Sequence, residues 1–92
     1  MYSYARINTN TSAKIGESGP TRLVRVVINT KGASSNKLDI YDGSEVATGT
    51  KVASIDTTSA VGNIEYDLIL NKGLFINIPN VGTAADVTIV YG

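Results

Sequence analysis

The ten residues TRLVRVVINT, Thr21–Thr30, carry the strongest strand signal in this chain. Branched apolar side chains restrict rotation about χ1 and pack well on a pleated surface, so the segment favours a β-strand. The two predicted faces are Val24, Val26 and Ile28 on one side and Leu23, Arg25 and Val27 on the other. A strand that is mostly apolar on both faces is expected at the centre of a sheet covered on both sides, and another molecule could supply one cover.

Shorter segments with the same two-residue alternation flank this strand, and helical periodicity is not sustained over three turns anywhere in the sequence. The expected strands are 2–7, 13–15, 21–30, 37–41, 51–56, 63–70, 74–78 and 86–91. Seven or eight short strands at roughly ten-residue spacing predict an all-β fold, a small antiparallel β-sandwich of immunoglobulin-like or jelly-roll type. A partly open β-barrel is the alternative.

The length of 92 residues fits one domain, residues 1–92, in which residues 1–8 form a strand or arm that contacts a neighbour. Such a short chain has a thin core, and small domains often gain stability from disulfides, metals or partners. The sequence has no cysteine and no histidine, which excludes disulfides and removes the commonest transition-metal ligands. We therefore expect a homo-oligomer.

Eight basic and eight acidic residues cancel, and they form no run of like charge. Nucleic acids and anionic membrane surfaces are bound through basic patches, so we expect neither partner. No apolar run approaches the roughly twenty residues of a membrane span. The first residues lack a basic segment followed by an apolar one, so we expect no signal peptide and synthesis in a reducing cytoplasm.

The titratable side chains offer little chemistry. Without histidine or cysteine, the usual general base and the best nucleophile are missing. Asp39, Asp42 and Glu45 cluster near one turn, where calcium is conceivable, although solvated turn residues explain them better. Glu65 and Asp67 on one side of a strand could form a paired-carboxylate site, but outward acids are ordinary there. We expect no enzyme activity, no catalytic residues, no metal and no cofactor.

Tyrosine supplies five of the six aromatic side chains, and its apolar ring with a polar tip suits interfaces. Tyr66 and Tyr91 are expected to fill the core with their hydroxyl groups at its border. Other aromatic residues, and apolar residues on the second face of strands, are expected to contact a neighbour. The interface candidates are Tyr2, Tyr4, Ile7, Leu23, Arg25, Val27, Tyr41 and Phe75.

Several stretches resemble small β-rich virion structural proteins of tailed bacteriophages. They are LVRVVINTKGASSN at 23–36, LDIYDG at 38–43 and IDTT at 55–58. The segment YSYARI at 2–7 and the segments 73–74 and 82–91 fit the same resemblance. The resemblance covers most of the chain and implies a structural role without active-site residues. It implies a capsid decoration or cement protein on the virion exterior, which binds the major capsid protein or other virion subunits.

A recognition module is the second interpretation: a phage tail or fibre component, or a carbohydrate- or receptor-binding domain. Sandwich folds host both kinds of function, so the fold does not choose between them. Recognition would use the loops at 33–36, 42–49 and 79–85. Sugar sites favour an exposed tryptophan or tyrosine platform, and the chain has no tryptophan. An enzyme is the third interpretation.

Overall fold

The structure, a computed structural model, describes the whole chain except residues 1, 17–18, 33–35, 59–61 and 79–82. Its strands are β1 (Ser3–Ile7), β2 (Ser12–Ile15), β3 (Thr21–Thr30), β4 (Lys37–Asp42), β5 (Thr50–Asp56), β6 (Gly62–Leu70), β7 (Leu74–Asn77) and β8 (Asp86–Tyr91). These eight strands confirm all the expected ones, with ends that agree to within one residue. The described residues form no helix, so none of them belongs to a helix that could cross a membrane.

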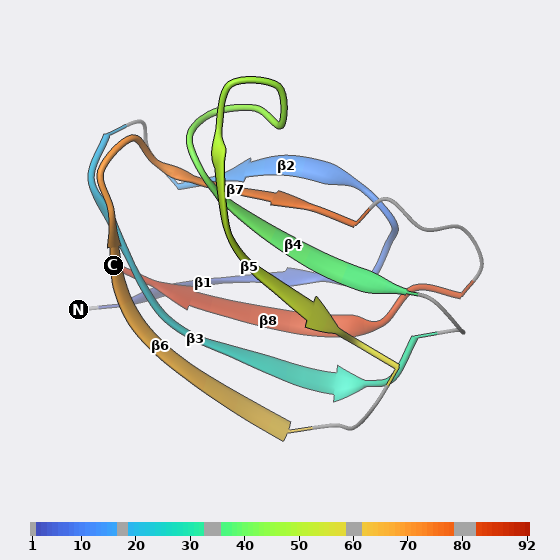
Figure 1. Ribbon diagram of the computed structural model, residues 1–92. Helices are drawn as coiled ribbons and strands as arrows, with labels where there is room; N and C mark the ends of the chain where they lie inside the picture. Colours follow the sequence, from blue (N-terminus) through green and yellow to red (C-terminus); the bar gives the residue numbers. More distant parts are fainter. Residues whose placement is uncertain (1, 17–18, 33–35, 59–61, 79–82) are drawn as a thin grey trace.

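The strands form two antiparallel sheets that face each other (Figure 1). Sheet A has the order β1-β8-β3-β6, and sheet B has the order β2-β7-β4-β5. The pairs β4–β5, β3–β6, β2–β7 and β1–β8 are those of one long hairpin, which rolls up so that β8 also pairs β3 and β7 also pairs β4. This is the strand order of a jelly roll with eight strands. The described strands therefore form the predicted sandwich, of the jelly-roll type, and not a barrel.

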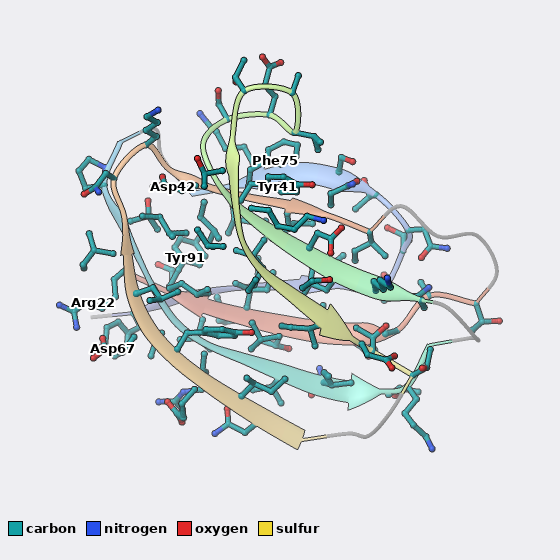
Figure 2. All side chains as sticks on the ribbon, viewed as in Figure 1. Arg22, Tyr41, Asp42, Asp67, Phe75 and Tyr91 are labelled. Atoms are coloured by element: carbon teal, nitrogen blue, oxygen red, sulfur yellow. The ribbon has the colours of Figure 1, made fainter. Side chains whose placement is uncertain are left out.

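One apolar layer between the two sheets forms the core. Alternate residues of each strand point into it, because successive side chains of a strand lie on opposite faces. Its buried members are Ile7, Ile15, Leu23, Val26, Ile28, Leu38, Ile40, Ile55, Leu70, Leu74, Ile76, Ile78, Ala85, Val87 and Ile89. Tyr66 and Tyr91 are only partly buried and pack against this cluster, as predicted. Figure 2 shows Tyr91 between the two sheets.

The predicted faces of the central strand β3 need one correction. Leu23 lies in the core with Val26 and Ile28, although simple alternation placed it on the opposite face. The pairing of β3 with both β6 and β8 shifts between Leu23 and Arg25. Val24 is the residue inside this shift, and it is buried but lies outside the core cluster. An irregularity of this kind changes the direction of the side chains that follow it.

A buried polar network ties four connections together at one end of the sandwich. Asn36 is fully buried, and its side-chain NH2 group donates to Asn10 Oδ1 at 3.0 Å and to the Thr83 carbonyl at 3.4 Å. Its Oδ1 accepts a hydrogen bond from Thr57 Oγ1 at 3.0 Å, and its main-chain carbonyl accepts from the Thr57 N–H at 3.3 Å. One side chain thus joins the connections that follow β1, β3, β5 and β7.

Replacing Asn36 with alanine is expected to lower the free energy of unfolding by about 1–3 kcal/mol, because the buried Thr57 hydroxyl loses its acceptor. For a domain of this size, each kcal/mol lowers the melting temperature by about 4–8 °C. Thermal unfolding followed by circular dichroism measures the change. The exposed Asn71 is the matched control, and Asn71→Ala should change stability by less than about 0.5 kcal/mol. Equal stabilities of the two variants would contradict the role of Asn36.

Candidate interaction surface

The residues that alternate with the core members form the outer face of sheet A. Strand register arranges eight of them in two neighbouring rows that cross all four strands. The first row is Tyr4, Val90, Arg25 and Glu65, and the second is Arg6, Thr88, Val27 and Asn63. These eight residues are called the outer face of sheet A below. The face therefore brings together Tyr4, Arg25 and Val27, three of the predicted interface candidates.

The exposure of these three candidates differs across the face. The Tyr4 residue is 72% exposed on the edge strand β1, and Tyr2, just before this strand, is 56% exposed. The Arg25 side chain is 42% exposed on the central strand β3, and Val27 is half-buried beside it. Large amphipathic rings and an arginine are side chains that are enriched in protein interfaces. The face thus presents an exposed ring at its edge and a half-buried apolar residue at its centre.

All three arginines of the chain lie on this side of sheet A, and each pairs with an acidic residue on a neighbouring strand. Arg6 binds Asp86 through two hydrogen bonds of 3.0 and 2.6 Å, and Arg22 contacts Asp67 at 2.6 Å. Figure 2 shows the Arg22–Asp67 pair at the border of the sheet. Exposed ion pairs of this kind contribute little to stability. Their main effect is to hold the charged groups in place across the sheet.

Arg25 is held less tightly than the other two arginines. Its Nε lies 3.7 Å from Glu65 Oε1, which is beyond hydrogen-bond distance, and this buried nitrogen has no acceptor among the residues that the structure describes. An unmatched buried donor has a desolvation cost of about 1–3 kcal/mol. The pair is therefore poorly optimised within the isolated chain, so a small shift of the guanidinium toward an acceptor on a partner would disrupt little.

On this side of the sheet, the pKa of Asp86 is shifted by its neighbours. The hydrogen bond from Arg6 holds the pKa of Asp86 below its usual value, and a hydrogen bond from Asn29 acts in the same direction. The same pair raises the pKa of Arg6 above its usual value. Asn29 also donates to Thr88 Oγ1 at 3.0 Å. Arg6 is thus fixed in orientation by a network that spans β1, β8 and β3.

Two of the predicted interface candidates lie in the core instead. Ile7 is 9% exposed and Leu23 is fully buried, and both belong to the apolar layer between the sheets. For Leu23 the cause is the register shift in β3, which turns its side chain inward. Ile7 is the last residue of β1, where it alternates with the outward Arg6. Neither side chain is available to a partner of the folded chain.

Tyr41 and Phe75 form a second apolar cluster on the outer face of sheet B. Their rings meet edge to face with centroids 6.4 Å apart, and Lys51 Nζ lies 5.9 Å from the centre of the Tyr41 ring. Figure 2 shows the two rings side by side below the β4–β5 connection. They are only 7% and 9% exposed, so the chain itself already covers most of both residues. This corrects their place among the interface candidates.

The three acidic side chains of the candidate calcium turn, Asp39, Asp42 and Glu45, each accept hydrogen bonds from different groups of the chain. Asp39 accepts a hydrogen bond from Ser54 at 2.6 Å, while the Asp42 carboxylate accepts from the main-chain N–H groups of Asn71 and Lys72. Glu45 accepts from Thr48 Oγ1 at 3.3 Å. Among the described residues, no three acidic side chains are placed to hold a metal ion. The calcium alternative for this turn therefore finds no support in the part of the chain that the structure describes.

Glu65 and Asp67 also do not form a paired-carboxylate site. Glu65 faces Arg25 and Asp67 pairs with Arg22, so each acid points toward an arginine of β3. Asp67 has a positive φ of 56° beside the register shift of β3 and β6. Aspartate tolerates this conformation better than most residues. Both carboxylates are thus structural parts of the outer side of sheet A.

Sequence reasoning did not select the other outer-face residues. Val90 lies between Tyr4 and Arg25, and Thr88 lies between Arg6 and Val27. The alternation within 86–91 could have placed Thr88 and Val90 on one face of β8. Only the register of the strands shows which residues of β1 and β3 they separate, because β1 and β3 do not pair directly.

No protein-family model matches this chain, and no curated protein matches its sequence. The fold and the geometry of its surfaces are therefore the basis for the function proposed below.

Replacing Arg6 with alanine is expected to raise the pKa of Asp86 toward the ordinary aspartate value of about 3.9, because the hydrogen bond that lowers it is lost. Since Asp86 has a lower pKa in the folded than in the unfolded chain, its contribution to stability is present above about pH 4 and is lost as the pH falls through the folded pKa. The wild type should therefore be more stable than the variant at neutral pH, and the difference should close in acid.

Nuclear magnetic resonance titration of the Asp86 carboxyl carbon measures the pKa, and urea unfolding at several pH values measures the stability difference. Arg22→Ala is the control, because Arg22 pairs with Asp67 and should leave the pKa of Asp86 unchanged. An unchanged pKa of Asp86 in the Arg6→Ala variant would show that the ion pair does not form in solution.

Proposed function

We propose that this chain is a non-enzymatic virion structural protein, a bacteriophage capsid decoration or cement protein that binds the lattice of major capsid protein on the capsid exterior. Its role is to bridge neighbouring subunits of that lattice and stabilise the shell. The observation that carries the proposal is the outer face of sheet A, where the exposed Tyr4, the loosely paired Arg25 and the half-buried Val27 and Val90 lie together.

The composition of this face supports binding to protein. Its positive charges are arginines, whereas the lysines Lys14 and Lys51 lie on the opposite sheet. Arginine is enriched in protein interfaces and lysine is depleted, because the guanidinium is more weakly hydrated and forms directed hydrogen bonds. The neighbouring acids keep the face from being strongly basic, so it does not favour a nucleic acid.

The fold supports the proposal by analogy. Jelly rolls with eight strands occur in viral capsid proteins and in lectins, although a fold by itself does not determine function. A small face on a single domain of this size is expected to bind weakly as a single copy. Many symmetry-related copies on a lattice gain strength through multivalency. A small domain with one such face therefore suits a cement role.

The test is binding to purified capsid shells that lack the decoration protein. Arg25→Ala and Val27→Ser change the centre of the face, and each is expected to weaken shell binding about tenfold or more, as the loss of a central interface residue typically does. Co-sedimentation of shells with increasing protein measures saturation. Shell disruption by heat or low salt measures the stabilising effect.

Lys72→Ala is the matched control, because Lys72 is an exposed cation in the β6–β7 turn and not on this face. It should bind shells like the wild type. Wild-type protein that does not saturate any shell, or variants of Arg25 and Val27 that bind normally, would reject the proposed role of this face.

The second candidate function is a tail or fibre component, or a carbohydrate- or receptor-binding module. The observation that favours it is the exposure of Tyr2 and Tyr4, because exposed rings can stack on sugars. Binding of the wild type to a glycan array, lost in Tyr4→Ala, together with no binding to shells, would favour this function over capsid decoration.

A further inference from the structure

We propose that two copies of this chain pair through the free edges of their β1 strands, antiparallel and centred on Ala5. The two copies of sheet A then form one continuous sheet across a two-fold axis. This contact uses the edge of β1, with Tyr4 and Arg6 at the border of the outer face of sheet A, whereas the proposed capsid contact is centred on Arg25 and Val27. It gives the expected homo-oligomer a definite geometry. The argument rests on the edges of the two sheets, on the strand register and on the charges beside Ala5.

Of the four sheet edges, three carry features that oppose pairing with another strand. Edge β6 has the register shift and the acidic Glu65 and Asp67, and edge β5 has a shift that leaves Val52 unpaired beside Lys51. Edge β2 has only four residues and includes Lys14. Bulges, short strands and lysines are the devices by which proteins protect exposed edges.

Edge β1 is the least protected of the four, because it is one residue longer than β2 and its one charged residue, Arg6, is bound by Asp86 of the neighbouring strand β8. Its five residues pair with β8 in five consecutive steps without a register shift, and they include no lysine, proline or acid. The regular pairing leaves the other edge of β1 straight enough to accept a further strand. Main-chain hydrogen bonds would supply the affinity, as in other cases of strand addition. The least protected edge is thus the one that carries the exposed Tyr4.

The sequence of β1 is complementary to itself in one register. When two copies run antiparallel and all five residues of each strand pair, Ala5 lies opposite Ala5 of the second copy, and Tyr4 lies opposite Arg6. Both Tyr4 and Arg6 lie on the outer face, so the two rings meet the two guanidinium groups on the same side of the joined sheet. A two-fold interface requires this self-complementarity.

The Tyr4–Arg6 contact is favourable and available. Tyr4 is 72% exposed, and the Arg6 side chain is 60% exposed although it is bound to Asp86. A guanidinium that is held in plane by a carboxylate still offers its flat face to an aromatic ring. Ala5 is small, so the inward sides of the two strands can approach at the two-fold axis without a clash. No other edge strand places a ring opposite a cation in this way when it is paired with itself in full register.

Substitutions at Tyr4 test the register by the sign of their effect. Tyr4→Lys places a cation opposite Arg6 and is expected to weaken the dimer, whereas Tyr4→Glu places an anion there and is expected to keep or strengthen it. Residue 4 lies opposite Arg6 twice in the dimer, once on each side of the axis. The dissociation constants of the Tyr4→Lys and Tyr4→Glu dimers should therefore differ by about tenfold. Sedimentation equilibrium over a wide range of protein concentration measures them. Both changes are at an exposed position, and circular dichroism verifies that the fold is retained.

Ile69→Lys is the matched control, because Ile69 is 52% exposed on the opposite edge strand β6. It should dimerise like the wild type. Five residue pairs between two β1 strands would bury less area than a stable interface, so the wild-type dimer should be weak and dependent on concentration. A wild type that stays monomeric up to millimolar concentration, or equal dissociation constants for Tyr4→Lys and Tyr4→Glu, would overturn the proposal.

Single cysteines test the geometry directly, since the chain has none of its own. Ala5→Cys should form a disulfide dimer under mild oxidation, because directly opposed residues have Cα atoms about 4.5–5.5 Å apart, within disulfide range. Ser3→Cys should cross-link much more slowly, because four residues of offset separate the two copies of position 3 by roughly 13 Å along the strands. Equal rates for the two variants would contradict the register.

The dimer and the capsid contact can fail independently. Arg25→Ala should lose shell binding and keep the dimer, whereas Tyr4→Lys should weaken the dimer in solution without shells. If Ala5→Cys cross-links only to capsid protein that carries a cysteine, and never to a second copy, then β1 pairs with a strand of the capsid subunit and the proposed dimer is wrong.

Discussion

Every strand of this domain depends on one constraint, which is that a single apolar layer must be buried between two sheets of only four strands each. Alternation along each strand commits half of its residues to that layer. A shift of one residue in any strand would expose its apolar set, so the register is strongly specified. The other half of the residues point away from the core and can differ between the two outer faces. Those outer faces are therefore where a specific binding surface can form.

The two outer faces are built on the same pattern with different results. On sheet B, the rings of Tyr41 and Phe75 are almost buried, with Lys51 beside them. On sheet A, Tyr4 remains exposed, and Arg6 is held by Asp86. Aromatic side chains were reasonable interface candidates in both places. Whether such a ring stays exposed depends on the side chains that pack over it in the folded chain. For Tyr41 these include Phe75, which is distant in the sequence.

The strands themselves were predictable because alternation and turn residues are local signals. Leu23 was placed on the wrong face because the register shift in β3 arises from its pairing with β6 and β8, which the sequence of β3 does not encode. The jelly-roll order could be named only as one of two types, since strand partners are non-local. Asn36 lies in the predicted loop before β4, but its full burial and its bonds to Asn10 and Thr57 join residues distant in the sequence, so the loop signal alone does not reveal them.

The two proposed contacts use different parts of one sheet, and this separation matters for assembly. Main-chain groups at the edge of β1, with the side chains of Tyr4 and Arg6, would join copies, while side chains centred on Arg25 and Val27 would face another protein. A continuous sheet across the two-fold axis would place two such faces side by side, on the same side of the joined sheet. If each face binds weakly alone, two linked faces would bind with a high effective concentration. Edge pairing would therefore raise the strength of a weak interface without requiring new contacts to the partner.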